Sequence, residues 1–333
     1  MLDIFKKIAA AQGVSGNESD TAGVIAELMS QYTDDISIDN LGNLIAVKKG
    51  SGENKQKIML CAHMDEIGFM ATFIEKNGFV RIAPVGGINY TAVAFTRVRS
   101  ENGVRGVIVP EAKVKPADFR AENFLIDIGA KDEKEAARRV KIGETFRFDN
   151  DILKLIGKRV CGHPADDRIG CAVLVDIARR LDGADIKDDV YYVFSVQEEV
   201  GCRGSKTAAY AIAPDISLAF EVTATGYTPS ATHMACELGG GAAIKIKDSS
   251  VICDPSLVDE LIAVAKEKKI KHQLEVLLYG GTDTSSMQMA GVGSRAGALS
   301  IPTRYIHSPN EMLDMGDAEA CAELAAEFIK GQN

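Results

Sequence analysis

Short apolar runs that lead to a histidine or a carboxylate constrain this chain more than any other sequence feature. Four runs share the property: 58–62 leads to His63, 190–196 to Glu198 and Glu199, 216–220 to Glu221, and 298–306 to His307. Runs of this length between helical stretches indicate buried strands of a layered sheet. The carboxyl ends of the strands in an open α/β sheet face a common crevice. We therefore expect these histidines and acids to lie together there.

Helical and strand-like patterns alternate along most of the chain. The helical spacing of apolar residues covers 1–7, 21–29, 169–181, 258–268 and 318–330, and strand patterns cover 57–62, 189–196, 216–220 and 298–301. This alternation predicts an α/β fold with helices layered on a sheet. Asp166 and Asp167 lie at the start of the helix predicted near residue 168, where carboxylates suit the helix dipole.

The segment 68–160 has a different character. Strand-like pieces broken by turns dominate it, as at 97–99 and 107–109. A chain of 333 residues is also long enough for two domains. We therefore predict a discontinuous α/β domain formed by residues 1–67 and 161–333, with a β-rich domain of residues 68–160 inserted into it.

The composition narrows the partners and the cellular location. The net charge is −9 and no block of Lys or Arg is long enough to follow a phosphate backbone, so we expect no nucleic-acid partner. No apolar run approaches the ~18 residues that span a bilayer, and the N-terminus lacks the features of a signal peptide. We therefore expect a cytoplasmic protein without a membrane partner. The seven cysteines form no C-x-x-C pair, which argues against disulfides or a zinc knuckle.

The residue types at the predicted strand ends, with those before the helix near residue 168, suit a pair of divalent cations. The set comprises two imidazoles and three carboxylates, at His63, His307, Asp166, Glu199 and Glu221. Zn²⁺ takes imidazole and carboxylate ligands, and two such ions about 3.5–4 Å apart can activate a water nucleophile. Glu198 remains as a candidate base. Zn²⁺ is the first choice of metal, with Co²⁺ and Mn²⁺ as alternatives.

Five longer motifs carry a resemblance to a known family. They are AHMDEIG at 62–68, DDRIGC at 166–171, QEEVG at 197–201, GGTD at 280–283 and RYIHSP at 304–309. Together and in this order they resemble the M42 family of metallo-aminopeptidases, which includes the glutamyl and the tetrahedral (TET) aminopeptidases. The resemblance extends from about residue 5 to residue 328 and implies a layered zinc-peptidase domain.

The resemblance also implies which residues bind two metal ions. One ion would be held by His63, Asp166 and Glu221. The second would be held by Asp166, Glu199 and His307, so that Asp166 is shared. Many relatives carry Asp at the position of Glu221, which leaves the substrate preference open.

Two further roles follow from the resemblance. Glu198 would act as the general base that takes a proton from the attacking water. Asp65 would hydrogen-bond the ring of His63 and fix its tautomer. The implied activity is removal of the N-terminal residue from short peptides. The domain 68–160 would mediate dimerisation, and dimers would assemble into a hollow dodecamer.

Two other functions deserve comparison. A glycoside hydrolase would use two of the carboxylates and no metal, which leaves His63 and His307 unexplained. It would also favour aromatic platforms for sugars, whereas the chain has no tryptophan and only 6% aromatic residues. A non-catalytic assembly or binding protein on a degenerate peptidase scaffold would lack a ligand or the base, and none is missing here.

Each site residue taken alone has a simpler explanation. Asp166 and Asp167 could cap a helix, Glu198 and Glu199 could end a solvated loop, and His63 could be a core histidine. Their joint occurrence in family order favours the metal site. The remaining histidines, His163, His233 and His272, match no ligand position.

Several conspicuous residues receive no catalytic role. The glycines at 239–241 lack the Lys-Ser or Lys-Thr of a phosphate-binding loop, so we expect them to allow a close backbone approach beside the substrate. The motif 280–283 is expected to form a pocket wall, with Asp283 as a candidate contact. Lys245, Arg295 and Arg304 could favour acidic substrate side chains if they reached the pocket, but we expect them on the solvated surface, where charged residues usually lie.

Overall fold

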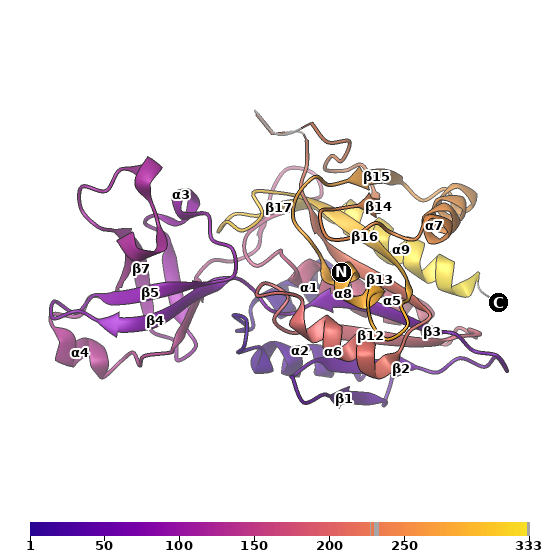
Figure 1. The fold of residues 1–333 in the computed structure, drawn as a ribbon, viewed down its shortest axis with the longest axis horizontal. Coiled ribbons are helices and arrows are strands. Elements are labelled where there is room, and N and C mark those ends of the chain that lie inside the picture. Colours follow the sequence, from indigo (N-terminus) through magenta and orange to yellow (C-terminus); the bar gives the residue numbers. More distant parts are fainter. Residues whose placement is uncertain (227, 230–232, 332–333) are drawn as a thin grey trace.

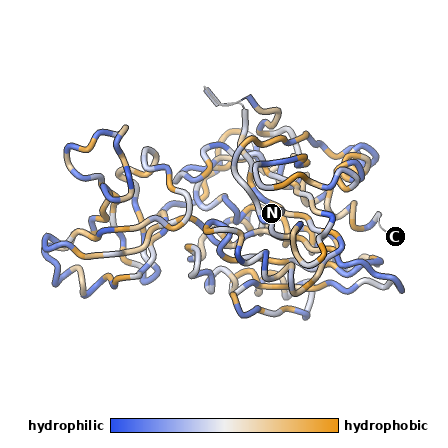
Figure 2. The backbone as a smooth tube through the Cα atoms, in the orientation of Figure 1, coloured by the Kyte–Doolittle hydropathy of each residue, from blue (hydrophilic) through white to orange (hydrophobic). Residues whose placement is uncertain are grey.

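The computed structural model describes residues 1–226, 228–229 and 233–331, which form two connected parts (Figure 1). The larger part is a sheet with helices on both of its faces, and the smaller part is a closed β-barrel. Hydrophilic stretches of the chain lie at the outer loops of both parts (Figure 2). The layered α/β fold predicted from the sequence is confirmed.

The large sheet contains eleven of the described strands, and its centre is parallel. Nine strands follow one path: β1 (Ile36–Ile38), β2 (Leu44–Lys48), β12 (Asp189–Ser195), β3 (Lys57–His63), β13 (Ile216–Thr223), β16 (Arg295–Arg304), β17 (Met312–Asp314), β11 (Arg159–Cys161) and β10 (Leu153–Lys154). Strands β12, β3, β13 and β16 run parallel to their neighbours in this order. Beside them, β14 (Ala242–Lys247) pairs with β16 and with β15 (His272–Val276).

The register of the parallel strands brings several polar residues to one edge. Ser195 at the end of β12 lies opposite His63 at the end of β3. In β13, Ala219 lies opposite Cys61 of β3, so Glu221 comes two residues farther toward the same end. The carboxyl ends of the three strands therefore meet at one edge of the sheet.

Helices cover both faces of the sheet because successive strand residues point to opposite sides. On β3, Ile58, Leu60 and Ala62 face the larger core, and Met59 and Cys61 face a smaller one. The larger core contains residues of α1 (Leu2–Ala9), α2 (Ser19–Met29), α5 (Arg168–Leu181), α7 (Pro255–Lys268) and α9 (Met315–Lys330). The smaller core contains residues of α6 (Arg203–Ile212) and α8 (Asp283–Gln288). No helix in the described ranges has the length and hydropathy needed to cross a membrane.

Carboxylates begin the long helices. The side chain of Asp167 accepts a hydrogen bond from the backbone N–H of Gly170 at 3.1 Å and caps α5. Asp254 and Asp314 cap α7 and α9 in the same way. Such caps satisfy backbone donors that have no partner inside the helix, and they explain why these helices begin where they do.

The β-barrel closes through six strands in the order β4 (Gly68–Ile74), β5 (Val80–Val85), β8 (Phe124–Asp127), β7 (Arg105–Pro110), β6 (Arg97–Ser100) and β9 (Thr145–Phe148). Its connections contain α3 (Tyr90–Val93), α4 (Glu133–Ala137) and the 3₁₀ turns η1 (Pro116–Asp118) and η2 (Ala121–Asn123). Phe69, Phe124, Phe146 and Phe148 fill its interior and are almost fully buried. The barrel therefore has a hydrophobic core of its own.

The chain returns to the large sheet before the end of the segment that the sequence assigned to the β-rich insertion. Strand β10 pairs with β11, and β11 pairs with β17 of the large sheet. Residues 153–160 thus extend the large sheet instead of the barrel. Their partner β17 is about 150 residues farther along the chain, so a local sequence pattern does not reveal the pairing.

Candidate active site

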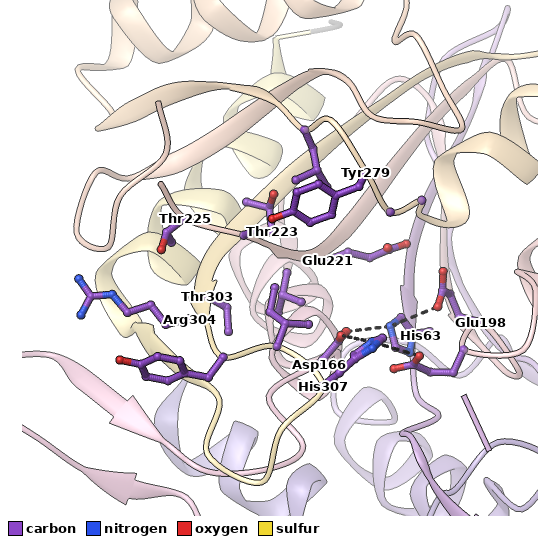
Figure 3. A pocket seen from close by; sticks show the side chains of 18 of the residues that line it. His63, Asp166, Glu198, Glu221, Thr223, Thr225, Tyr279, Thr303, Arg304 and His307 are labelled. Atoms are coloured by element: carbon purple, nitrogen blue, oxygen red, sulfur yellow. Dashed lines mark hydrogen bonds and ion pairs between the residues drawn. The ribbon is translucent and has the colours of Figure 1, made fainter. Parts of the chain in front are cut away.

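A cavity of about 880 Å³ opens at the carboxyl ends of the central strands (Figure 3). Its lining includes His63 from the end of β3, Glu198 and Glu199 from the loop after β12, and Glu221 from β13. The loop before α5 and the loop after β16 contribute two more residues of the predicted set, Asp166 and His307. The structure thus brings the five predicted ligands and the predicted base into one cavity.

Asp166 lies between the two histidines. Its Oδ1 is 3.1 Å from Nε2 of His63, and its Oδ2 is 3.4 Å from Nε2 of His307. The other ring nitrogen of His63, Nδ1, lies 3.2 Å from the backbone carbonyl oxygen of Asp65. Each Nε2 is therefore directed toward the same carboxylate, as Figure 3 shows.

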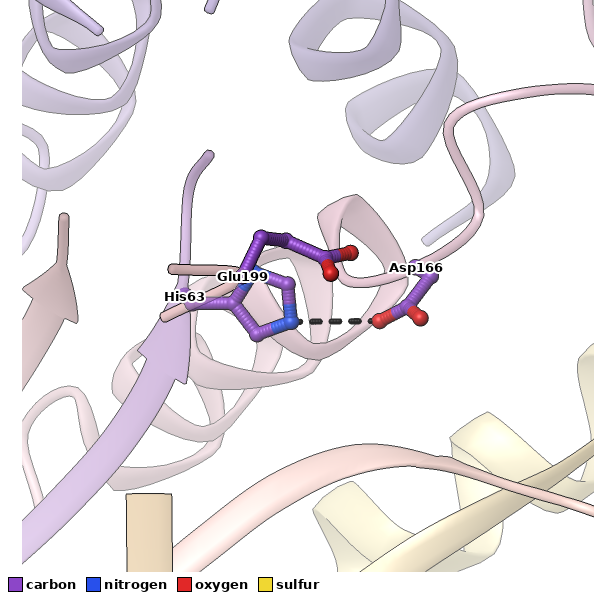
Figure 4. A group of neighbouring side chains, drawn as sticks. All are labelled: His63, Asp166 and Glu199. Atoms are coloured by element: carbon purple, nitrogen blue, oxygen red, sulfur yellow. Dashed lines mark hydrogen bonds and ion pairs between the residues drawn. The ribbon is translucent and has the colours of Figure 1, made fainter. Parts of the chain in front are cut away.

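Glu199 completes this cluster. Its Oε2 is 3.2 Å from Nε2 of His307. One ligand atom from each of His63, Asp166 and Glu199 lies within 4.8 Å of the others (Figure 4). This spacing is small enough for the three side chains to contact a common ion.

Asp65 fixes the loop that carries the two glutamates. Its carboxylate accepts hydrogen bonds from the backbone N–H groups of Glu198 at 3.0 Å and Glu199 at 3.2 Å, and from the hydroxyl of Ser15 at 2.6 Å. The same carboxylate lies 3.4 Å from Nδ1 of His63, slightly farther than the carbonyl oxygen of its own residue. Asp65 thus lies beside the ring, with its backbone carbonyl as the hydrogen-bonding group, and its carboxylate positions the loop after β12.

Glu198 lies beside the cluster. Its Oε2 is 4.0 Å from Nε2 of His63, and its Oε1 accepts a weak hydrogen bond from the thiol of Cys202 at 3.2 Å. No other described group donates a hydrogen bond to its carboxylate in the structure. One of its oxygens is therefore available to a substrate or a water molecule.

Glu221 lies on another wall of the cavity. Its Oε1 accepts a hydrogen bond from the backbone N–H of Asp283 at 2.7 Å. Asp283 itself is buried, and its carboxylate accepts hydrogen bonds from the hydroxyls of Ser195 and Ser205, each at 2.6 Å. Gly280 and Gly281 line the cavity, whereas the side chain of Asp283 lies behind it. The side chain of Asp283 therefore does not reach the cavity, and Asp283 is linked to the site by the hydrogen bond from its backbone N–H to Glu221.

Burial and pairing shift the proton affinities of these groups in opposite directions. Burial would lower the pKa of His307, but hydrogen bonds to Asp166 and Glu199 outweigh it and raise this pKa to about 11. Burial would raise the pKa of Asp166, but hydrogen bonds to both histidines hold it below its usual range. Burial raises the pKa of Glu199, and raises the pKa values of Glu198 and Glu221 well above the usual range.

The side chains of the site offer ligand atoms for a pair of cations, and their carboxylates carry negative charge that such cations would neutralise. Oε1 of Glu199 is buried and has no hydrogen-bond partner among the described residues. Four carboxylates and two imidazoles share the cavity, and mutual repulsion among buried carboxylates disfavours their ionised forms. Divalent cations would offset that repulsion, and imidazole with carboxylate is a donor set that zinc accepts. The residues present therefore fit the metal ions that the sequence implied.

The charged residues expected on the surface divide into three cases. Lys245 is fully buried on β14, where it pairs with Glu275 and lies 3.5 Å from Asp248. The expectation was wrong because β14 is an interior strand, and the buried carboxylates of Glu275 and Asp248 offset the charge of Lys245 there. Arg304 is half-buried and lines the cavity, which was the alternative to the outer surface for this residue. Arg295 pairs at the periphery with Glu260 at 2.7 Å, as a surface residue would.

The glycines at 239–241 do allow a close backbone approach, but not beside the cavity. The N–H groups of Gly239 and Gly241 each donate a hydrogen bond of 2.7 Å to Asp317 in the first turn of α9. A side chain at Gly241 would collide with the backbone of Lys271, and its φ of 89° favours glycine. The expected contact with substrate was therefore wrong, and these glycines connect α9 to the start of β14.

None of the three remaining histidines appears in the described lining of the cavity. His163 is buried between Glu66 and Glu311. Nδ1 of His272 bonds the backbone carbonyl of Ile270 at 3.0 Å. His233 is exposed. These placements agree with the sequence analysis, which gave the three histidines no ligand role.

Sequence reasoning missed several residues of the site. Thr223, Tyr279 and Tyr305 line the cavity, and no local pattern marks them in the sequence. Glu311 contacts the backbone at both Asp166 and His307. It follows His307 by four residues, a proximity that could have drawn attention to it.

Comparison with known proteins assigns the chain to a family. The M42 glutamyl aminopeptidase profile matches residues 42–324. The chain belongs to the M42 peptidase family. A protein of Acetivibrio thermocellus named "Putative aminopeptidase" is 44% identical to this M42 member over 99% of this chain and 98% of its own length. The lysyl aminopeptidase of Pyrococcus furiosus is 33% identical over 98% and 96% of the two chains.

Solved structures resemble this M42 chain over almost its whole length. An aminopeptidase from the archaeon Desulfurococcus kamchatkensis has a TM-score of 0.94 and 35% identity, with 99% of this chain and 94% of that chain covered. The Pyrococcus horikoshii TET1 peptidase, described as assembling into a tetrahedron or a large octahedral shell, has a TM-score of 0.88 and 31% identity, with 98% of each chain covered. A structure named as an endoglucanase of Thermotoga maritima has a TM-score of 0.83 and 32% identity, covering 98% and 97%.

These findings confirm the family resemblance that the sequence motifs carried. The M42 family consists of metal-dependent aminopeptidases, and this member is a hydrolase that acts on peptides. The cavity contains a group of side chains able to hold a metal ion.

Proposed function

We propose that this M42 enzyme removes the N-terminal residue from short peptides, using two divalent cations and Glu198 as the general base. The observation that carries the proposal is the cluster in which the carboxylate of Asp166 lies between His63 and His307 inside a cavity. Carboxylates and imidazoles around one shared carboxylate are suited to a pair of cations.

The two ions would have one shared ligand. His63, Asp166 and Glu221 would hold one, and Asp166, Glu199 and His307 would hold the other. The two oxygens of Asp166 already face different histidines, which suits a shared ligand. When bound, such ions supply an activated water nucleophile and polarise the scissile carbonyl. Zn²⁺ is the first choice, and Co²⁺ and Mn²⁺ share the same ligand preferences closely enough to replace it.

Glu198 is placed to move the proton. Its carboxylate lies within the cavity beside His63, and Asp65 fixes its backbone. Burial raises the pKa of Glu198 well above its usual range, which helps the carboxylate to retain a proton taken from the attacking water. Glu198 would then deliver this proton to the leaving amine.

The carboxylates also provide a reason for cleavage at the N-terminus. A free α-ammonium group carries a positive charge, and Glu198 and Glu221 line the cavity that would receive it. An internal peptide bond has no such charge to offset the burial of these acids. The cavity would therefore favour the end of a chain over its interior.

A substitution at the base tests this proposal. Glu198→Gln removes the proton acceptor and keeps the size of the side chain, so we expect kcat on an aminoacyl chromogenic substrate to fall at least ~100-fold. The metal content measured by mass spectrometry should stay at two ions per chain, because Glu198 is not among the proposed ligands.

A matched control for this experiment is Glu319→Gln. Glu319 is partly exposed on α9, outside the cavity, and pairs with Lys158 at 2.7 Å, so this variant should keep the activity and the metal content of the wild type. Wild-type turnover by Glu198→Gln would contradict the role of Glu198. A wild-type protein that binds no divalent cation would contradict the metal site itself.

We further propose that the barrel within the segment 68–160 mediates dimerisation and that dimers form a dodecamer. The similarity to the Pyrococcus horikoshii TET1 peptidase supports this, as do two large apolar side chains exposed on the barrel part, Phe73 and Phe95. Light scattering at low micromolar protein should give a mass twelve times that of one chain, and Phe95→Asp should reduce it. A monomer in both samples would contradict the proposal.

One structural relative is named an endoglucanase, which makes glycoside hydrolysis the second candidate. That chemistry needs two carboxylates and no metal, whereas here His63 and His307 both face Asp166. We expect no hydrolysis of carboxymethylated glucan. Hydrolysis that persists in a chelator would favour the glycosidase over the peptidase.

A further inference from the structure

Glu311 lies outside the proposed ligand set, yet its carboxylate contacts the backbone on both sides of the site. Oε2 accepts hydrogen bonds from the backbone N–H groups of Ala165 at 2.7 Å and Asp166 at 3.1 Å. Oε1 accepts a hydrogen bond from the backbone N–H of His307 at 3.0 Å. Only 1% of the surface of Glu311 is exposed. One buried carboxylate thus joins the loop before α5 to the loop after β16.

We propose that Glu311 is a positioning residue that sets the distance between the side chains of Asp166 and His307. This inference rests on the proposed function, because the distance between Asp166 and His307 matters for activity only if these two side chains hold metal ions. The two loops come from distant parts of the chain and share no strand pairing at these residues. Without Glu311, the N–H groups of Ala165, Asp166 and His307 would lose their acceptor, and the loops would lose a side chain that bonds the backbone of both.

A buried charge network holds Glu311 itself. Nδ1 of His163 lies 3.4 Å from Oε2 of Glu311, and Nε2 of His163 lies 3.2 Å from Glu66. Glu66 in turn pairs with Arg168 at 3.1 Å and Arg147 at 3.2 Å. All five residues are at most 2% exposed. His163 therefore restrains the carboxylate of Glu311 on one side, while this carboxylate accepts hydrogen bonds from the backbone of the two loops.

The network reaches from the metal cluster to the barrel. Arg147 belongs to β9 of the barrel, and Arg168 belongs to the first turn of α5, one residue after the helix cap. The edge of the Phe148 ring also packs on the ring of His163, with centroids 4.8 Å apart. Groups that orient metal ligands from outside the coordination shell commonly change metal affinity 10- to 100-fold when they are removed. We expect an effect of this size for Glu311.

The test measures metal affinity directly. The full-length protein is stripped of metal and titrated with Zn²⁺ against a chromophoric chelator, in the wild type and in Glu311→Gln. The amide cannot accept hydrogen bonds with both of its ends, so at least one loop is released. The apparent affinity for Zn²⁺ should fall about 10- to 100-fold, and kcat should fall while KM changes little. Glu319→Gln serves as the matched control and should bind Zn²⁺ as the wild type does.

A purely structural role would give a different pattern. It would lower the melting temperature of the apo and zinc-bound proteins by equal amounts and leave the Zn²⁺ affinity unchanged, and that result would overturn the proposal. If Glu311→Gln fails to fold, Glu311→Asp replaces it, because this variant keeps the charge beside His163 but is too short to reach both loops. Wild-type Zn²⁺ affinity in a folded Glu311→Asp would equally overturn the proposal.

The same titration separates this inference from the proposed function. A wild-type protein that binds no Zn²⁺ would contradict the metal site, and with it the reason for Glu311. A wild-type protein that binds two ions, together with variants that bind them equally well, would contradict the inference alone.

Discussion

Carboxylates that share the cavity hold protons with different affinities. Asp166 is buried, but its contacts with His63 and His307 keep its pKa below the usual range. Glu198 is largely buried and lies farther from His63, at 4.0 Å, so burial dominates and raises its pKa well above the usual range. The first carboxylate is suited to remain ionised as a ligand, and the second is suited to accept a proton. The environment of each residue therefore decides its proposed role.

His163 gives a prediction for the pH dependence of stability. Burial would lower its pKa, but Glu311 and Glu66 outweigh burial and raise it from 6.5 to about 9. Because the folded pKa exceeds the unfolded one, the stabilisation is complete below pH 6.5 and is lost as the pH rises through about 9. Its size is of the order of 3 kcal/mol, at ~1.36 kcal/mol per unit of pKa.

Urea unfolding of the chelated protein between pH 6 and pH 10 measures this effect. The free energy of unfolding of the wild type should fall across this range more steeply than that of His163→Gln. His233→Gln changes an exposed histidine and should follow the wild type. Equal slopes for the wild type and His163→Gln would show that His163 does not stabilise the fold through its charge.

At the scale of the elements, the strand ends supply only part of the site. Strand β3 ends at His63, and Glu221 lies near the end of β13. Asp166 and His307 come from connecting loops, and hydrogen bonds to Glu311, which lies in the same loop as His307, hold the two backbones together. The parallel sheet thus gives a rigid base, and the loops bring in the remaining ligands.

The cap of α7 provides a prediction that concerns stability alone. The side chain of Asp254 accepts hydrogen bonds from the backbone N–H of Leu257 at 2.8 Å and from the hydroxyl of Ser256 at 2.6 Å. Asp254→Ala should lower the free energy of unfolding by about 0.5–2 kcal/mol, measured by urea denaturation. The specific activity of the folded protein should not change, since α7 packs against α9 and β14, and contributes no residue to the described lining.

Asp254→Asn is the control for this substitution. Asn caps a helix about as well as Asp, and the loss of the partly exposed ion pair with Arg295 is a small effect. The variant should therefore keep most of the stability. A large loss of activity at unchanged stability in Asp254→Ala would contradict the separation of α7 from the site.

At the scale of the molecule, buried charges join the two parts. Glu66 lies between Arg147 of the barrel and Arg168 of α5, and Arg147 also donates hydrogen bonds to the carbonyl oxygens of Ala9, Ala10 and Ala11. Removal of one partner from a buried pair leaves an uncompensated charge. The orientation of the barrel relative to the sheet is therefore specified by directional contacts as well as by apolar packing.

Metal removal should destabilise the whole molecule, because the proposed ligands come from segments distant in sequence. A metal ion that binds only the folded protein stabilises it by ~2.7 kcal/mol when the free ion is present at 100 times its dissociation constant. A chelator should therefore lower the melting temperature in calorimetry, and added Zn²⁺ should restore it. His63→Ala removes a ligand of one of the two proposed ions, so its zinc-dependent shift in melting temperature should be smaller than that of the wild type. A zinc-dependent shift of wild-type size in His63→Ala would place the ion elsewhere.

Much of the fold and of the site could be predicted from the sequence. The alternation of helical and strand patterns predicted α5, α7 and α9 and the central parallel strands, because amphipathic periodicity depends on local sequence alone. The strand ends and motifs likewise indicated six residues that line the cavity, namely His63, Asp166, Glu198, Glu199, Glu221 and His307. The sequence also assigned the family, because several motifs occur together in order.

Other features depended on the tertiary structure. The burial of Lys245 and the return of residues 153–160 to the large sheet follow from pairing between distant strands. The contacts of Glu311 join two loops that meet only after the sheet has formed. Local sequence determines which residues can form a helix, a strand or a ligand. The packing of remote segments decides which residues bury or pair with a given side chain, because burial and charge pairing are properties of the assembled fold.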